Sequence, residues 1–211
     1  DDDVAVAVVT GGGSGIGRAV AIRLARGGWA GGGGGWAGGR RVRVVIAGRR
    51  AKALDETKAL CGPDAVVVCV PTDVTRERDV TRLFSRLKRC DQLINNAGVN
   101  VPPTSVVAMS LSDWRWVVGT NLDAAFHVAR EAFKLMTTHG GGRIVNNGSV
   151  SAAAPRPGSV AYTASKHAVT GLTKSLALDG RPFDIAAGQI DFGNVVSAIS
   201  DGMATGMPQA D

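Results

Sequence analysis

The strongest constraint on the fold is a glycine-rich loop between an apolar run and a helical pattern near the start of the sequence. Residues 4–9 form an apolar run typical of a buried parallel strand, and residues 18–26 have a helical pattern. The segment between them reads Thr10-Gly11-Gly12-Gly13-Ser14-Gly15-Ile16-Gly17. Glycines let the backbone approach a ligand closely, and a helix N-terminus offers free N–H groups and a partial positive charge. The order strand, glycine loop and helix therefore predicts a phosphate-binding site, with a plain flexible turn as the alternative.

Strand-like and helix-like segments alternate along the rest of the chain. We expect strands at residues 41–47, 65–70, 92–94, 143–147 and 184–187, and helices at residues 51–60, 75–88, 111–138 and 159–178. This alternation predicts one α/β domain over residues 1–211, a doubly wound parallel sheet between two helical layers. Ligands of such sheets bind at the carboxyl ends of the strands. The residues at those ends, which we expect to share a site, are Thr10, Gly48, Asp73, Asn95 and Ser149.

Composition narrows the classes of partner. Charged residues are 20% of the 211 residues and aromatic residues are 5%, which fits an aliphatic α/β protein. Much of the net charge of +6 comes from Arg40, Arg41, Arg43, Arg49 and Arg50, which surround the second predicted strand. No aromatic residues interleave with them, so we interpret this cluster as a site for a small anion and not for nucleic acid. No apolar run approaches the roughly 20 residues of a membrane span.

The cysteines indicate the redox compartment of the protein, and one repetitive segment indicates where the chain is mobile. Cys61, Cys69 and Cys90 form no C-x-x-C pair, so we expect no metal site, no disulfide framework and a reducing, cytoplasmic compartment. No signal peptide is visible, and the sequence begins at Asp1 without Met. Residues 27–39 contain Gly-Gly-Trp-Ala-Gly-Gly twice. We expect this segment to be a mobile insertion, because glycine loses much conformational entropy on ordering.

A tyrosine and a lysine four residues apart carry the second chemical signal. Tyr162 and Lys166 lie in the predicted helix 159–178, so their side chains share one face. A phenol has an unperturbed pKa of about 10, and a neighbouring ammonium lowers it. The spacing therefore indicates a proton donor or acceptor near neutral pH, with a surface tyrosine beside a solvated lysine as the alternative. Ser149 follows the fifth predicted strand, where its hydroxyl could polarise a carbonyl.

Taken together and in their order along the chain, these motifs resemble those of the short-chain dehydrogenase/reductase family. The resemblance extends from residue 4 to about residue 194. The motifs are Thr10-Gly11-x-x-x-Gly15-x-Gly17, Asp73, Asn95-Asn96-Ala97-Gly98, Asn121, Ser149 and Tyr162-x-x-x-Lys166. The resemblance implies a Rossmann fold that transfers hydride between a nicotinamide cofactor and a carbonyl/alcohol pair. It also implies a small ketone, aldehyde or alcohol as substrate, and a homodimer or homotetramer built on the two long helices.

The resemblance implies a role for each catalytic residue. Tyr162 would be the general acid in reduction and the base in oxidation. Lys166 would hold the nicotinamide ribose and lower the tyrosine pKa. Ser149 would hydrogen-bond the substrate oxygen and stabilise the charge that develops there. Asn121 would anchor a proton-relay water beside Lys166, with a helix-surface amide as the alternative.

The resemblance also implies a set of cofactor contacts. Asp73 would bind the adenine amino group beside the Val74 backbone, and it could also cap the helix at residues 75–88. The backbone of Ile190 would hold the nicotinamide amide. Asn95, Ala97 and Gly98 would border the adenosine ribose, with a plain Asn-Gly turn as the alternative. With the loop and the catalytic pair, the expected contacts are Gly11, Ser14, Gly15, Ile16, Gly17, Arg49, Asp73, Val74, Asn95, Ala97, Gly98, Tyr162, Lys166 and Ile190.

The end of the second strand predicts which cofactor is preferred. An NAD-specific relative has a carboxylate there, which binds the ribose hydroxyls. Gly48 takes that place here, and Arg49 follows with a guanidinium suited to a phosphate. We therefore predict NADP (NADPH) as the cofactor. The alternative is that Arg49 and Arg50 are solvated residues at the start of a helix.

The sequence departs from the family after the sixth strand, where the family has Pro-Gly-x-x-x-Thr. We align this pattern with residues 187–192, so Ala187 and Phe192 replace the proline and the threonine, and Gly188 is kept. We then expect residues 193–211 to be an incomplete substrate lid and a last strand to be missing. A non-catalytic dinucleotide-binding or interaction protein is therefore the alternative to an active enzyme.

Overall fold

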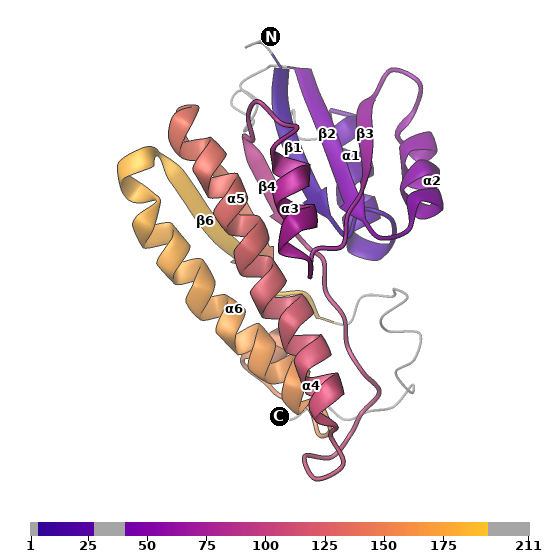
Figure 1. Cartoon of the computed structure of the whole chain (residues 1–211), viewed down its shortest axis with the longest axis vertical. Helices are drawn as coiled ribbons and strands as arrows, with labels where there is room; N and C mark the ends of the chain where they lie inside the picture. Colours follow the sequence, from indigo (N-terminus) through magenta and orange to yellow (C-terminus); the bar gives the residue numbers. More distant parts are fainter. Residues whose placement is uncertain (1–3, 28–40, 194–211) are drawn as a thin grey trace.

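The computed structural model describes residues 4–27 and 41–193 and shows a single six-stranded parallel sheet (Figure 1). The strand order is β3-β2-β1-β4-β5-β6. The strands are β1 (Val4–Thr10), β2 (Arg41–Gly48), β3 (Val66–Pro71), β4 (Gln92–Asn95), β5 (Gly142–Asn147) and β6 (Ile185–Ile190). The helices are α1 (Gly15–Ala25), α2 (Ala51–Cys61), α3 (Glu77–Phe84), α4 (Leu111–Val118), α5 (Ala124–Thr138) and α6 (Val160–Asp179). The predicted insertion and lid lie outside the described residues, apart from Gly27 and Gly193.

Two apolar cores, one on each face of the sheet, hold the layers together. Successive residues of β1 alternate between them: Val6 and Val8 belong to one core, and Ala7 and Val9 belong to the other. The first core packs under α3, α5 and α6, and the second packs under α1 and α2 (Figure 1). Because buried strands point side chains to both faces, a continuous apolar run such as residues 4–9 is what this position requires. The predicted three-layer, Rossmann-type sheet is thus confirmed.

Two helices differ from their predicted bounds for local reasons. The helix expected at residues 75–88 is shorter, because Asp73 Oδ1 accepts hydrogen bonds from the N–H and the hydroxyl of Thr75 and holds a turn there. The N-cap position is Arg76, so Asp73 is not the cap. The helix expected at residues 111–138 is interrupted by the π-helical turn η1 (Gly119–Asp123) between α4 and α5.

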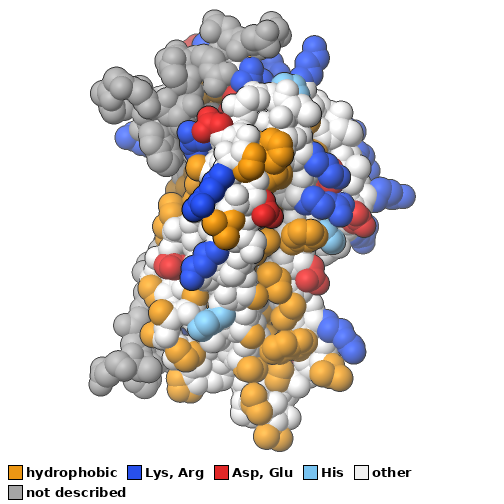
Figure 2. Space-filling model, turned by 90° about the vertical axis from the view of Figure 1, so that its left-hand side faces the viewer, with side chains coloured by type: hydrophobic (Ala, Val, Ile, Leu, Met, Phe, Trp, Pro, Cys, Tyr) orange, Lys and Arg blue, Asp and Glu red, His pale blue; other side chains and the backbone are white. Residues whose placement is uncertain are grey.

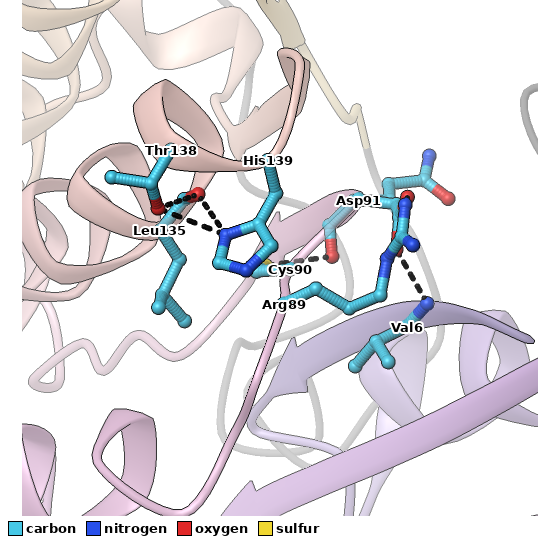
Figure 3. A network of polar contacts seen from close by, with 8 residues as sticks. Val6, Arg89, Cys90, Asp91, Leu135, Thr138 and His139 are labelled. Atoms are coloured by element: carbon cyan, nitrogen blue, oxygen red, sulfur yellow. Dashed lines mark hydrogen bonds and ion pairs between the residues drawn. The ribbon is translucent and has the colours of Figure 1, made fainter. Parts of the chain in front are cut away.

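At the amino edge of the sheet, Asp91, the residue before β4, bonds to β1 (Figure 3) and to β5. Its Oδ2 accepts a hydrogen bond from the Val6 N–H at 2.8 Å, and Arg89 binds the carboxylate with two nitrogens, at 2.6 and 2.9 Å. The Asp91 carbonyl accepts from the Arg143 N–H at 2.9 Å. These bonds connect β1, β4 and β5 on the edge opposite to the carboxyl ends.

None of the helices in the described part of the chain has both the length and the hydropathy of a membrane span. Within residues 4–27 and 41–193, no group of three or more His, Cys, Asp or Glu side chains is placed to hold a metal ion.

Candidate active site at the carboxyl edge of the sheet

The glycine loop between β1 and α1 depends on its glycines for conformation and for space. Gly11 has φ of +67° and Gly15 has φ of +50°, in the left-handed region that favours glycine. A Cβ on Gly17 would overlap the Gly11 carbonyl oxygen and the Asn96 amide. Ser14 is the N-cap residue of α1 and makes no side-chain cap bond, so the first N–H groups of this helix face the loop without a hydroxyl acceptor.

Three polar residues join this loop to the next two strand ends. The Thr10 hydroxyl accepts hydrogen bonds from the N–H groups of Asn96 and Ala97, at 2.9 and 3.0 Å. The Asn96 amide donates to the Thr10 carbonyl and accepts from Asn147 Nδ2 at 2.7 Å. The ends of β1, β4 and β5 are therefore bonded to one another. Position at a strand end was the sequence signal for Thr10, and the same signal would have found Asn147, which the sequence analysis missed.

A cleft of about 500 Å³ opens beside the loop, within the range of small-ligand sites. Its lining residues come from the glycine loop, from the ends of β2 and β3, from α2, from the loop after β4, and from α4 and the turn that follows it. They are Gly11, Gly13, Ser14, Gly48, Arg49, Arg50, Ala53, Leu54, Thr72, Asp73, Val74, Thr75, Ala97, Gly98, Val99, Asn100, Val101, Pro102, Pro103, Trp116 and Thr120. The glycine-lined backbone, the two arginines and a carboxylate fit the adenosine and phosphate groups of a dinucleotide. The sequence analysis did not identify Trp116 and Thr120 as part of this cleft.

Asp73 is charged and held in place within the cleft. Burial acts to raise the pKa of its carboxyl, but the two hydrogen bonds from Thr75 and the charges of Arg49 and Arg76 outweigh burial, so this pKa is lowered. An ionised carboxylate accepts hydrogen bonds and donates none, which suits an amino group as the partner. Arg49 is exposed at the end of β2 and faces the same cleft.

Ser149 and Tyr162 meet at the end of β5. Ser149 is buried, its hydroxyl accepts from the Ser151 N–H at 3.1 Å, and it lies near enough to the Tyr162 side chain to act on its pKa. The pKa of Tyr162 is raised, because burial of the phenol outweighs the effects of Ser149 and of the Arg156 charge, which both act to lower it. The expectation of a lowered tyrosine pKa is therefore wrong.

Lys166 explains why the expected effect on the tyrosine is absent. It is 4% exposed, and its Nζ donates to the Asn147 carbonyl at 2.6 Å. Nζ lies 5.6 Å from the centroid of the Tyr162 ring, so it faces the ring and is not bonded to the phenol oxygen. Burial lowers the pKa of Lys166 to about 8, although the charge of Asp191 acts to raise it.

Asn121 lies in the π turn and links two other parts of the site. Its Oδ1 accepts from the Val99 N–H at 2.8 Å, and its Nδ2 donates to the Val99 carbonyl and to the Ser165 hydroxyl. Ser165 in turn donates to the Tyr162 carbonyl at 2.7 Å. The π turn, an element often found at functional sites, thus fixes the tyrosine-bearing helix against the loop after β4.

Asn95 points away from the cleft. Its side chain is buried, and its Nδ2 donates to the Ala125 carbonyl at 2.8 Å and to Asn146 Oδ1 at 3.1 Å. The predicted ribose contact does not fit this orientation, because successive side chains of a strand point to opposite faces and Asn95 faces α5. Ala97 and Gly98 do line the cleft.

The predicted alignment after β6 is also wrong. β6 extends to Ile190, and Gly188 pairs with Val145 inside the strand, so it cannot be the glycine that follows the strand. The Ile190 carbonyl is bonded to the Gly148 N–H at 2.9 Å. The family pattern begins instead at Phe192-Gly193, which moves the threonine position to Ser197 and the nicotinamide contact to Val195, both outside the described residues.

The predicted residues thus form two groups along the carboxyl edge. Gly11, Ser14, Arg49, Asp73, Val74, Ala97 and Gly98 line the cleft, whereas Gly15, Ile16, Gly17, Asn121, Ser149, Tyr162, Lys166 and Ile190 do not. The second group begins next to the first, because Gly17 packs on Gly11 and because Asn121 Oδ1 would lie 3.3 Å from a Cβ on Gly98.

Comparison with known proteins agrees with this arrangement. The family model described as short chain dehydrogenase matches residues 5–206. A 3beta-hydroxysteroid dehydrogenase of Mediterraneibacter gnavus is 38% identical over 185 residues, 84% of this chain and 61% of the relative, so the chain spans less than two thirds of that protein. A structure from Beutenbergia cavernae with bound NADP is 33% identical, with a TM-score of 0.81 over 94% of this chain and 76% of that chain.

A short chain dehydrogenase/reductase of Burkholderia phymatum in complex with NAD is 31% identical, with a TM-score of 0.81 over 95% of this chain and 69% of that chain. The sheet order, the glycine loop and the matched family model together lead to one conclusion. The chain belongs to the short-chain dehydrogenase/reductase family.

Proposed function

We propose that the protein is an NADPH-dependent oxidoreductase that interconverts a small ketone or aldehyde and the corresponding alcohol. The observation that carries this proposal is that Ser149 and Tyr162 lie together at the end of β5, with Lys166 facing the tyrosine ring, on the edge that also holds the glycine loop. The name of the Mediterraneibacter gnavus relative supports an alcohol or ketone as the substrate class.

The side chains present support a division of work in that reaction. When bound, the nicotinamide supplies or accepts the hydride. Tyr162 donates its proton to the carbonyl oxygen in reduction, and its raised pKa keeps that proton in place at neutral pH. Ser149 holds the same oxygen through its hydroxyl, where charge develops. Lys166 presents a positive charge when protonated, which offsets the charge left on the phenol.

The proposed acid is tested with Tyr162→Phe. The phenyl ring keeps the packing of α6 and loses the transferable proton, so we expect turnover of a ketone panel with NADPH to fall by about 10²–10⁴-fold. The dissociation constant for NADPH, measured by fluorescence titration, should stay within about threefold, well under the 1.4 kcal/mol of a tenfold change. Ketone reduction by this variant at the parent rate would refute the role of Tyr162.

The preference for NADPH is proposed from Arg49. This guanidinium lines the cleft where Gly48 offers no carboxylate, and a 2′-phosphate would meet a charge-assisted partner there. Arg50 lines the same cleft and adds positive charge. Such a hydrogen bond contributes about 1.5–3 kcal/mol, which corresponds to a preference for NADPH over NADH of roughly ten- to a hundredfold. Family membership leaves this choice open, since related structures hold either NADP or NAD.

Arg49→Ala tests the cofactor preference against a matched control. We expect the variant to lose most of the NADPH preference and to keep its NADH affinity, because the adenosine contacts are untouched. Arg41, which was predicted to share an anion site with Arg49, lies instead at the exposed start of β2, on the opposite edge of the sheet. Arg41→Ala therefore removes the same charge away from the cleft and should leave both affinities unchanged. Equal dissociation constants for NADPH and NADH in the parent would exclude phosphate recognition by Arg49.

The alternative, a dinucleotide-binding protein without turnover, has one observation in its favour. The cleft is lined by the proposed adenosine contacts, whereas Ser149, Tyr162 and Lys166 lie outside its lining. Tight NADPH binding with no reduction of any ketone or aldehyde would favour that function.

A cytoplasmic location is proposed on the chemistry of the thiols. Cys61, Cys69 and Cys90 are all free within the described residues. The pKa of Cys90 is raised far above its usual range by burial. Unpaired, protonated thiols are typical of a reducing compartment.

A further inference from the structure

Asp191, the first residue after β6, lies against the backbone at the proposed catalytic serine. Its Oδ1 accepts hydrogen bonds from the Ser149 N–H at 2.9 Å and from Gln189 Nε2 at 2.6 Å. A Cβ on Gly148 would overlap this same oxygen. The glycine that precedes Ser149 therefore leaves room for the carboxylate, and any other residue at position 148 would displace it.

A row of polar side chains, buried at Asn95, Asn146 and Thr173 and half-buried at Gln189, runs through the sheet and ends at the exposed carboxylate of Asp191. Asn95 Nδ2 donates to Asn146 Oδ1 at 3.1 Å, and Asn146 Nδ2 donates to the Thr173 hydroxyl at 2.9 Å. The Thr173 hydroxyl lies 3.4 Å from Gln189 Oε1, and Gln189 donates to Asp191. Satisfied buried networks of this kind fix side-chain positions. The row connects β4, β5, α6 and β6 to the one acceptor that also holds Ser149.

We infer that Asp191 is a positioning residue of the proposed catalytic centre, which fixes the backbone at Ser149 and adds a negative charge that favours the ammonium form of Lys166. The contacts stand on the geometry alone. What they achieve for turnover rests on the proposed function of Ser149 and Lys166.

The charges around Lys166 single out Asp191. Lys166 is buried, its Nζ has the neutral Asn147 carbonyl as a hydrogen-bond acceptor, and burial lowers its pKa to about 8 against the opposing charge of Asp191. The elements packed around Lys166 also carry Tyr162, His167, Lys174 and Asp179 on α6, Asp113 and Arg115 on α4, Asp123 on η1, Arg143 on β5, Arg181 after α6 and Arg156 before it. Among these charged groups, Asp191 acts to raise the pKa of Lys166, whereas Arg156 acts to lower the pKa of Tyr162.

The test replaces the carboxylate by an amide of the same shape. Asp191→Asn keeps an oxygen for the Ser149 N–H and removes the charge, so the pKa of Lys166 should fall. We would measure that pKa by ¹³Cε NMR titration, with the lysine signal assigned by its loss in Lys166→Met. If the enzyme reduces ketones, the basic limb of its pH profile for kcat/KM should move down by the same amount, and Asp191→Glu should restore it.

Asp64→Asn is the matched control, because Asp64 lies exposed in the turn after α2 and loses the same charge far from the site. Asp191→Ser replaces Asp191→Asn in the comparison if the amide variant does not fold. A Lys166 pKa that is lowered in the Asp191 variant but not in Asp64→Asn supports the inference. If the parent turns over no substrate, the same result still supports the inference, and only the proposed function fails. An unchanged Lys166 pKa, or an equal change in Asp64→Asn, overturns it.

Discussion

At the scale of single residues, Asp91 makes a sharp prediction about stability. Its side chain is 11% exposed and holds both Arg89, which is 18% exposed, and the Val6 N–H. Asp91→Ala would remove the largely buried carboxylate that binds both Arg89 and the Val6 N–H, so we expect the free energy of unfolding to fall by about 2–4 kcal/mol. Urea unfolding measures the change, with Asp64→Ala as the surface control. A loss under about 0.5 kcal/mol, the range of ordinary surface substitutions, would contradict this account.

Residue spacing identified the catalytic candidates, but it could not give their electrostatics. The four-residue spacing of Tyr162 and Lys166 does set both on one side of α6, as expected, with Nζ facing the ring. Burial decides their pKa values, and burial depends on β5, η1 and the segment after β6, which pack around them from distant parts of the sequence. The orientation of Asn95 could not be predicted for the same reason. The sequence places Asn95 at a strand end next to a glycine turn, but it does not show to which face of the sheet the side chain points or which groups it bonds.

At the scale of elements, the turn from β1 into α1 predicts an unequal response of two glycines to the same change. Gly17→Ala should overlap the Gly11 carbonyl, so we expect about 1–3 kcal/mol of lost stability and at least tenfold weaker NADPH binding. Gly171 lies within α6 with nothing near its added Cβ, and Gly171→Ala should instead stabilise by roughly 0.5–1 kcal/mol. Thermal unfolding with and without NADPH measures both. An equal response of the two variants would show that close packing does not require glycine at position 17.

Apolar runs and glycine punctuation predicted every strand of the described sheet to within a few residues. They failed where a side chain or an extra residue changes the backbone locally. The bonds from Thr75 to Asp73 delay the start of α3, and the π turn around Asn121 has no periodic signature in a segment that is helical on both sides. The error of five residues after β6 arose because Gly188 resembles a turn glycine, whereas pairing with β5 keeps it inside a strand.

At the scale of the whole molecule, the helical face of α4, α5 and α6 predicts self-association. Figure 2 shows hydrophobic side chains gathered on the side of the molecule where Figure 1 shows α6. The large exposed hydrophobic residues on these helices are Leu111, Trp116, Phe126 and Leu178. Apolar patches of this kind mark protein contacts. We therefore predict a dimer or tetramer at micromolar concentration in sedimentation velocity.

One substitution separates this helical face from surface hydrophobicity in general. Phe126→Glu places a charge on α5 and should weaken association at least tenfold, because an unpaired charge in an interface is costly. Leu60→Glu makes the same kind of change on α2, across the sheet, where Leu60 is 48% exposed, and should leave association unchanged. A parent that sediments as a monomer would count against this interface.

The bonds between Thr10 and Asn96 have a consequence for the order in which the chain folds. They join residues 86 positions apart, and they close the centre of the sheet at the same point where they shape the glycine loop. Closing a loop over so many residues costs conformational entropy and is slow. During synthesis, β1 can pair with its central neighbour β4 only after the half that contains β2 and β3 has been made. A nascent chain that ends at β3 holds its phosphate loop without the strand that braces it. The proposed capacity to bind a dinucleotide would therefore arrive with β4. Binding would then report a closed sheet and not merely a folded first half.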